Sequence, residues 1–410
     1  MGQRRQAREV HAPVRTAPGH AAAWAEFAGA GWAGLTAAED AGGQGLPLAL
    51  ATAVQEVFDA ANPGFGMLAL NARCAIRLLE RHGDPGMRET WLPALAAGYY
   101  PTNGRATGVA WMLGLGRFGG IQAGLAYAAS NPVTYYNADL VRRAGGDPEN
   151  FPKDWNGVLE LAGKIHRLGD GIEGMWYTWN GDDWMFSALL FGAGGRMLTP
   201  DERDVAFGGP EGLNALRLID RMVKEGGMPN LTAAAARQAF GAGKLGMIFQ
   251  TTALVRGTVS SVGENFALRT TEMPVIDAQK GRLPTGGAAG MLTAKDPAKR
   301  AAAWKFLRFS TGPEGQAMMV KNTGYLPCNQ IAIDDPQYLA AFYKANPLFV
   351  PAVRQIPISV PWYAFPGSNS VRVTQTMVDN IARVVEQKAT PEQVLPDMVA
   401  EVRRLLPRKG

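Results

Sequence analysis

Residues 125–137 read LAYAASNPVTYYN, and the character of the chain changes at this stretch. The composition predicts a strand, a turn at Asn131-Pro132 and a second strand, because aromatic and β-branched residues flank a turn-forming pair. Downstream of it, strand-like segments alternate with amphipathic ones, beginning with a helix opened by Asp154-Trp155. Such alternation predicts α/β lobes from about residue 122 to the C-terminus.

The later helices of this part begin at recognisable start signals. Pro210 and Pro313 each stand at the first position of an amphipathic run, and Asp296-Pro297 precedes another. Residues 233–250 predict a helix that leads into the strand KLGMIFQ, and residues 391–406 predict a C-terminal amphipathic helix.

Upstream of the α/β part the sequence divides into three segments. Residues 1–21 are polar and basic and are expected to form a loose arm. Residues 22–98 predict four helices, of which the second spans 48–61 with Leu50, Val54, Val57 and Phe58 on one apolar face. Residues 99–121 show no clear period and are interpreted as a junction.

Composition narrows the classes of protein that this chain can represent. The net charge is +5, but Lys and Arg are scattered, so a nucleic-acid-binding surface is not expected. Two distant cysteines, Cys74 and Cys328, are too few for a disulfide framework or a four-cysteine zinc site. No HxxxH or HxH pair occurs among the four histidines, so no metal site is predicted.

Export signals are not apparent in the sequence as written. No stretch reaches the roughly 20 apolar residues that a membrane-spanning helix needs. The basic N-terminus lacks the apolar segment of a secretory signal, so a chain expressed as written is expected to stay in the cytoplasm.

Motifs for catalysis are scarce. Residues 114–119, GLGRFG, fit the GxGxxG pattern of dinucleotide-binding proteins, but Pro132 leaves room for only a short helix after them. The adjacent acids Asp182-Asp183 and Asp334-Asp335 are interpreted as solvated or capping residues in turns. No catalytic residue is therefore predicted, and no cofactor.

Two features point instead to binding. Trp176, Trp179 and Trp184 lie within nine residues, and indole rings stack on sugars and polyols when they line a cleft. Core packing is the equal alternative from composition alone. Arg372 lies among Ser, Asn and Val, where its guanidinium suits a phosphate or carboxylate, although a surface arginine is the simpler interpretation.

Segments 129–165, 239–257, 299–327 and 391–406 together resemble the extracellular solute-binding proteins that serve ABC importers, in that family's order and spacing. The branch that binds glycerol 3-phosphate and sugars looks most similar. The resemblance implies a periplasmic-binding-protein-like α/β fold of two lobes that close on a ligand. It also implies that ligand-binding positions fall at Ser130, Trp176, Trp179, Thr251, Thr252, Gly286, Gly287, Tyr325 and Arg372.

Residues 22–98 are similar to a different family, the N-terminal helical domain of acyl-CoA dehydrogenases. Segments 27–68 and 78–98 carry this resemblance. The flavin-contacting segment of that family should follow, but the chain reads YYPTNGRATG at 99–108 instead. A flavoprotein remnant and a non-functional gene fusion or assembly artefact remain the alternative interpretations.

The apparent chimera predicts a small all-α segment followed by one complete and one incomplete lobe. The complete lobe is expected at about 133–253 and 325–410, and the incomplete lobe at about 104–132 and 254–324. The incomplete lobe should expose strand edges and apolar surface. The expected protein is a monomer that binds a sugar, polyol or glycerol phosphate, weakly, and serves the membrane subunits of an ABC importer. The resemblance implies a periplasmic or extracytoplasmic location.

Overall fold

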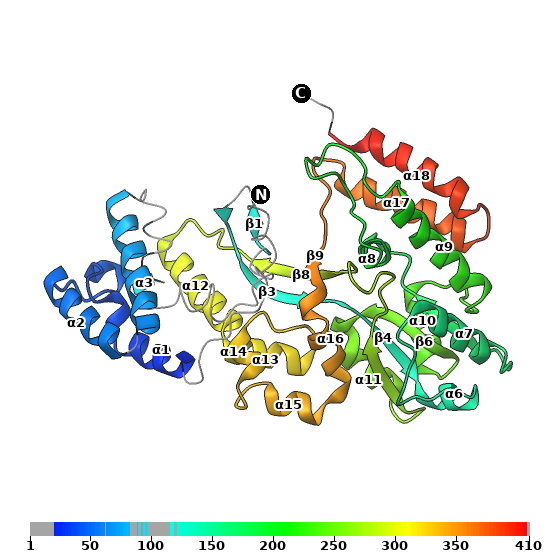
Figure 1. Ribbon diagram of the computed structural model, residues 1–410, viewed down its shortest axis with the longest axis horizontal. Coiled ribbons are helices and arrows are strands. Elements are labelled where there is room, and N and C mark those ends of the chain that lie inside the picture. The colour runs from blue at the N-terminus through cyan, green and yellow to red at the C-terminus, as the bar shows by residue number, and fades with distance from the viewer. Residues whose placement is uncertain are drawn as a thin grey trace, which may run out of the picture. The chain divides into compact units, whose positions relative to one another are not determined.

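The computed structural model describes residues 20–61, 63–82, 88, 92, 95–96, 115–118 and 121–407, and the statements below concern these residues (Figure 1). The chain divides into two compact units, Met1–Ala110 with Asn329–Ile331, and Trp111–Cys328 with Ala332–Gly410. None of the described helices is both long and apolar enough to cross a membrane. Three predicted parts lie mostly outside the described residues: the arm, the fourth helix and the junction.

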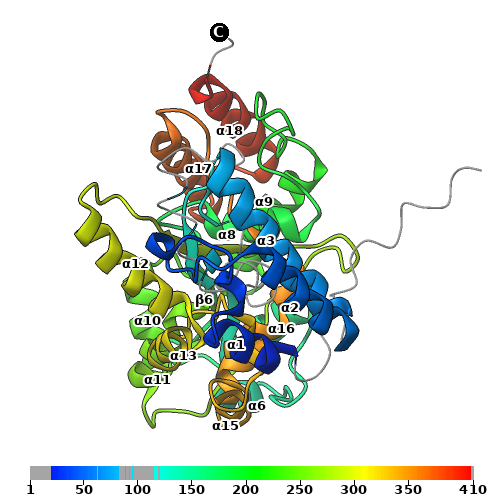
Figure 2. The same ribbon diagram turned by 90° about the vertical axis from the view of Figure 1, so that its left-hand side faces the viewer.

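The first unit is helical, as predicted. It contains α1 (His20–Gly29), α2 (Leu48–Ala61) and α3 (Pro63–His82), with short 3-10 turns η1 (Trp32–Gly34) and η2 (Glu39–Ala41). Figures 1 and 2 show α2 and α3 side by side. Trp24, Phe27 and Ala33 form a small buried cluster against which Phe58 packs.

The apolar face predicted for α2 is only partly correct. Ala51 and Gln55 are the buried residues of α2, whereas Leu50 is 45% and Val57 68% exposed. The reason is the buried Arg73 of α3, which donates one hydrogen bond to the Ala51 carbonyl (2.7 Å) and another to Gln55 Oε1. A buried guanidinium needs acceptors, so the polar side of α2 turns toward α3.

The second unit contains a four-stranded sheet in the order β5-β6-β4-β7. Its strands are β4 (Pro132–Asn137), β5 (Glu173–Tyr177), β6 (Leu245–Thr251) and β7 (Leu268–Glu272). β5 and β6 run parallel, while β4 is antiparallel to both β6 and β7. The helices of this lobe are α6 (Ala138–Arg143), α7 (Trp155–His166), α8 (Trp184–Gly192), α9 (Pro210–Lys224), α10 (Ala233–Gly241), α17 (Ser370–Val385) and α18 (Pro391–Leu405).

A smaller three-stranded sheet has the order β3-β8-β9. Its strands are β3 (Leu125–Ser130), β8 (Leu283–Gly290) and β9 (Ser359–Pro361). Two short antiparallel strands, β1 (Arg117–Phe118) and β2 (Ile121–Gln122), precede them in the sequence. The remaining elements are α11 (Val255–Val262), α12 (Pro297–Thr311), α13 (Pro313–Asn322), α14 (Gln330–Asp334), α15 (Ala340–Ala345), α16 (Val350–Arg354) and the 3-10 turns η5 (Thr252–Leu254), η6 (Pro347–Phe349) and η7 (Ile356–Ile358).

The smaller lobe exposes apolar side chains, as expected. We call Met291, Phe306, Phe309 and Met318 the α12–α13 patch, and these side chains are 45–64% exposed. β3 stands at the end of its sheet, and its outer edge is partly covered, because the Leu326 amide donates to the Ala129 carbonyl (2.6 Å) and Gln316 Nε2 donates to the Tyr127 carbonyl (2.9 Å).

Two features of the lobes differ from the sequence analysis. The two strands predicted within residues 125–137 are confirmed as β3 and β4, but no turn separates them, and β3 pairs with β8 whereas β4 pairs with β6 and β7. The chain passes straight from one sheet to the other at Asn131. In addition, β7 pairs in the four-stranded sheet, although residues 254–324 were assigned to the incomplete lobe. β9 pairs in the three-stranded sheet, although residues 325–410 were assigned to the complete lobe. Both pairings connect residues far apart in sequence, which local patterns do not encode.

Candidate ligand-binding site

Several predicted positions meet where strands of the four-stranded sheet end. The parallel strands β5 and β6 end there at Tyr177 and Thr251, and β4 begins there, because Pro132 is paired with Thr251. The carboxyl ends of strands in open α/β sheets are where ligands usually bind, since the connecting loops leave a crevice there. Strand β3 of the three-stranded sheet also ends here, at Ser130.

Ser130 lies opposite Gly286, and Ala129 lies opposite Gly287, in the antiparallel β3–β8 pair. A Cβ atom added at Gly286 would lie 2.8 Å from Ser130 Oγ and 3.7 Å from the ring of Trp184. The bare backbone at Gly286 therefore faces both a hydroxyl and an indole.

Other predicted residues at these strand ends join the same group through the backbone. The Thr252 amide donates to the Asn131 carbonyl (3.0 Å), and the Asn131 amide approaches Thr252 Oγ1 (3.4 Å). Tyr325 precedes Leu326, whose amide donates to the Ala129 carbonyl (2.6 Å). The structure thus brings together the predicted residues Ser130, Thr251, Thr252, Gly286, Gly287 and Tyr325.

The predicted tryptophans are buried. Trp176 in β5 is 0% exposed and Trp179, two residues after the end of β5, is 8% exposed. Neither indole nitrogen has a hydrogen-bond partner in the described part of the chain. Trp184, at the start of α8, shares this property and was not among the predicted site residues. The sequence signal for it was its place in the aromatic segment 176–184.

Arg372 is not brought to this group by any contact in the described chain. It lies in the first turn of α17, and its side chain is exposed. Thr374 of the same helix faces the lobe interior, where its hydroxyl donates to Asp183 Oδ1 (3.0 Å). Residues two apart on a helix point in different directions, so this contact does not carry Arg372 toward Asp183. The role of Arg372 stays a prediction.

Asp183 is a buried acid that sequence reasoning assigned to a solvated turn. It is 0% exposed, and the side chains of Thr374 and Trp362 hydrogen-bond to its carboxylate. Burial raises the pKa of its carboxyl to about 6. The hydrogen bonds from the side chains of Thr374 and Trp362 oppose this rise, and the charge of Asp182 adds to it slightly. A buried acid that holds its proton to this pH is a candidate functional group.

The raised pKa of Asp183 predicts a pH-dependent stability. The folded state keeps a proton that the unfolded chain releases at lower pH, so this carboxyl favours folding in acid and loses that contribution as the pH rises through about 6. We expect Asp183→Asn to stabilise the protein more at pH 8 than at pH 4, measured as the difference in urea midpoints. An equal difference at both pH values would contradict the shifted pKa.

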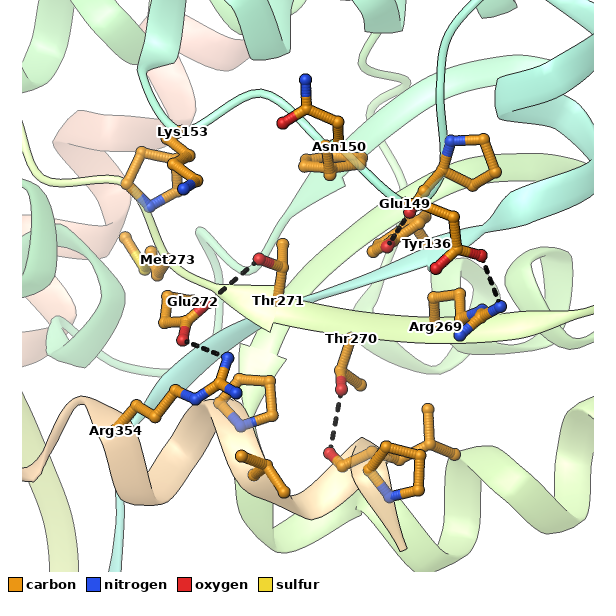
Figure 3. Close-up of a pocket in the computed structure, with 17 residues that line it drawn as sticks. Tyr136, Glu149, Asn150, Lys153, Arg269, Thr270, Thr271, Glu272, Met273 and Arg354 are labelled. Atoms are coloured by element: carbon orange, nitrogen blue, oxygen red, sulfur yellow. Dashed lines mark hydrogen bonds and ion pairs between the residues drawn. The ribbon is translucent and has the colours of Figure 1, made fainter. Parts of the chain in front are cut away.

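A separate pocket of about 610 Å³ lies along β7, away from these residues (Figure 3). Its walls come from the segments 148–153 and 347–354, and ion pairs cross it between Arg269 and Glu149 (2.7 Å) and between Arg354 and Glu272 (3.4 Å). It contains none of the predicted site residues. No group of three or more His, Cys, Asp or Glu side chains with metal-binding geometry occurs among the described residues.

Comparison with known proteins separates the chain into the two parts that the sequence indicated. The family model described as bacterial extracellular solute-binding protein matches residues 90–351. The model of the acyl-CoA dehydrogenase N-terminal domain matches residues 4–99, so this match begins inside the segment interpreted as an arm.

Curated relatives include the sn-glycerol-3-phosphate-binding periplasmic protein UgpB of Escherichia coli strain K12 and that of Shigella flexneri serotype 5b. Each is 26% identical to this chain over 298 residues, which are 69% of this chain and 66% of the relative. The chain thus matches slightly less than two thirds of the length of these relatives.

Solved structures share the fold of the second unit. The cyclic α-maltosyl-1,6-maltose binding protein of Arthrobacter globiformis aligns with a TM-score of 0.63 and 23% identity, over 73% of this chain and 75% of that one. UgpB of Mycobacterium tuberculosis, in complex with glycerophosphocholine, aligns with a TM-score of 0.61 and 22% identity, over 70% and 72% of the two chains.

Proposed function

The chain belongs to the family of bacterial extracellular solute-binding proteins, and from this premise we propose that it binds a sugar, polyol or glycerol phosphate for an ABC importer. The relatives named above bind glycerol 3-phosphate, a glycerophosphodiester or a cyclic oligosaccharide according to their names. In this proposal the chain acts without catalysis, outside the cytoplasm, as a monomer.

One observation carries the proposal. The indole nitrogens of Trp176, Trp179 and Trp184 are buried without a hydrogen-bond partner in the described chain. Buried polar atoms are nearly always paired, because an unpaired one costs about 1–3 kcal/mol. Ligand hydroxyl oxygens accept hydrogen bonds from indole N–H groups, so these three donors suit a polyhydroxyl solute.

The mechanism in this proposal is closure of the two lobes on the ligand. The lobes are connected where β3 passes into β4 at Asn131, and Ser130, Thr251, Thr252 and Tyr325 lie beside this connection. Gly286 has no side chain between the backbone of β8 and the groups of Ser130 and Trp184, and Gly287 is exposed. Arg372 would bind the phosphate of a charged solute.

We propose further that binding is weak. The smaller lobe has a three-stranded sheet, and the chain matches only 66% of the length of its relatives. Titration of the purified chain with maltose, glycerol 3-phosphate and glycerophosphocholine, followed by tryptophan fluorescence, tests both claims. We expect saturable binding of at least one solute in the millimolar range. Micromolar affinity would refute the impairment, and no saturable response to any of the three would refute the proposed function.

A second candidate function follows from the match to the acyl-CoA dehydrogenase N-terminal domain at residues 4–99. In that case the chain would be the remnant of a flavoprotein. The match covers one helical domain only, so dehydrogenase activity does not follow from it. Flavin absorbance in the purified protein, retained through dialysis, would favour this candidate over a solute-binding role.

A further inference from the structure

Three connections between the two sheets of the second unit meet at one buried side chain. β3 passes into β4 at Asn131, and β7 leads toward β8 from Met273 onward. α16, which packs against β4 and β7, leads through η7 into β9 at Ser359. Gln355, at the C-cap of α16, is 2% exposed and contacts all three connections. Each connection must bend when the lobes change their angle.

The contacts of Gln355 are buried hydrogen bonds. Its Nε2 donates to the Pro132 carbonyl (2.8 Å), and its Oε1 accepts from the Met273 amide (2.6 Å). Its backbone carbonyl accepts from Ser359 Oγ (2.9 Å). We call this set of three hydrogen bonds the Gln355 clasp, because it joins one residue from each of the three connections.

The strand register shows what the carboxamide of Gln355 replaces. The last pair of the β4–β7 ladder is Val133 with Glu272, so the next pair outward would be Pro132 with Met273. The carboxamide lies between the carbonyl of Pro132 and the amide of Met273 and satisfies both where the ladder ends. Buried backbone groups need partners, so loss of this side chain leaves one donor and one acceptor unpaired.

Asn131 adds a second link between the same segments. It is 0% exposed, and its Nδ2 donates to the Ala352 carbonyl in α16 (2.8 Å). Asn131 reaches from the β3–β4 connection to α16, and Gln355 reaches from the end of α16 back to that connection. Two buried side-chain amides that link the same two segments restrain their distance and orientation more than a single hydrogen bond does.

We propose that Gln355 is a positioning residue that sets the resting angle between the two lobes, with Asn131 as its support. The clasp holds the three connections at one point, so movement of the lobes becomes a rotation about that point instead of independent bending of each connection. The clasp acts in the protein without solute, so its role goes beyond the proposed function and does not depend on which ligand binds.

The test measures the distance between the lobes in the ligand-free full chain. Spin labels at Lys164→Cys in α7 and Lys305→Cys in α12, both exposed positions, report it by pulsed electron paramagnetic resonance. Cys74→Ser removes the exposed native thiol, and the buried Cys328 stays unlabelled. Gln355→Met keeps a side chain of similar length without the two side-chain hydrogen bonds. We expect it to make the distance distribution about twofold wider than in the parent protein.

Gln316→Met is the matched control. Gln316 is 0% exposed, its Nε2 donates to the carbonyls of Tyr127 in β3 and Ser310 in α12, and its Oε1 accepts from the Cys328 amide. These hydrogen bonds stay within the smaller lobe. Both methionine variants should lower the melting temperature by several degrees, because each leaves buried backbone groups unpaired. Only Gln355→Met should widen the distance distribution.

An unchanged width in Gln355→Met, or an equal increase in both methionine variants, overturns the proposal. If Gln355→Met does not fold, Asn131→Ala decides. Asn131 Oδ1 has no partner among the described residues, and the Asn131 carbonyl keeps its hydrogen bond from the Thr252 amide, so this variant should fold. We expect it to widen the distribution as well, and an unchanged width would overturn the proposal. Solute titration tests the proposed function separately, so either idea can fail without the other.

Discussion

Replacing Trp176 with alanine should lower the free energy of unfolding of the second unit by about 3–5 kcal/mol. Trp176 is fully buried in β5, beside Ile248 of the parallel strand β6. Removing the indole deletes a large apolar side chain and leaves a cavity that the surrounding strands cannot close. Urea unfolding followed by circular dichroism measures this loss, and a loss below about 1 kcal/mol would contradict the buried position.

Trp176→Phe separates packing from recognition. Phenylalanine keeps most of the buried ring but removes the Nε1 donor, which has no partner among the described residues. Stability should fall much less than in the alanine variant. If Trp176 contacts the ligand, as the family resemblance implies, the phenylalanine variant binds its solute more weakly although it folds. Unchanged affinity would make Trp176 a residue of the core alone.

Gly287→Ala should destabilise the protein by about 3 kcal/mol, whereas Gly286→Ala should not. A Cβ at Gly287 would lie 2.4 Å from the Ala128 carbonyl oxygen, which belongs to the paired strand and cannot rotate away. A Cβ at Gly286 meets Ser130 Oγ at 2.8 Å instead, and a hydroxyl at the end of a side chain can turn aside.

The two glycine variants therefore serve as controls for each other. Gly286→Ala places a methyl group between Ser130 and Trp184, so it should weaken solute binding about tenfold or more at near-normal stability. Thermal unfolding and fluorescence titration of both variants check this contrast. Equal melting temperatures of the two variants would show that β3 and β8 are not paired in the register described here.

Local signals in the sequence predicted the elements of the second unit well. Asp154 caps α7 by accepting from the Gly157 amide (3.0 Å), and Asp296 caps α12 by accepting from the Lys299 amide (2.8 Å). These signals succeed because an N-cap depends on residues three positions apart. The elements expected from 233–250 and 391–406 are also confirmed, as α10, β6 and α18.

Long-range features were beyond the reach of such signals. The sequence did not show that residues 268–272 pair with β4, because a strand's partner is chosen by the whole sheet. It also placed Asp183 in a solvated turn, since adjacent acids are usually exposed. In the folded chain Asp183 is buried, and it accepts a hydrogen bond from Thr374, which lies 191 residues away. The group of predicted residues around Ser130 and Thr252 was located only through the family resemblance.

The α12–α13 patch has a consequence for the fate of the chain in a cell. Phe306 and Phe309 are 64% and 45% exposed and Met318 is 54% exposed on adjacent helices. Chaperones and proteases recognise exposed apolar side chains, which are typical of an incompletely folded chain. We expect chaperones to hold the protein and proteases to degrade it, so quality control would set its abundance more than synthesis does.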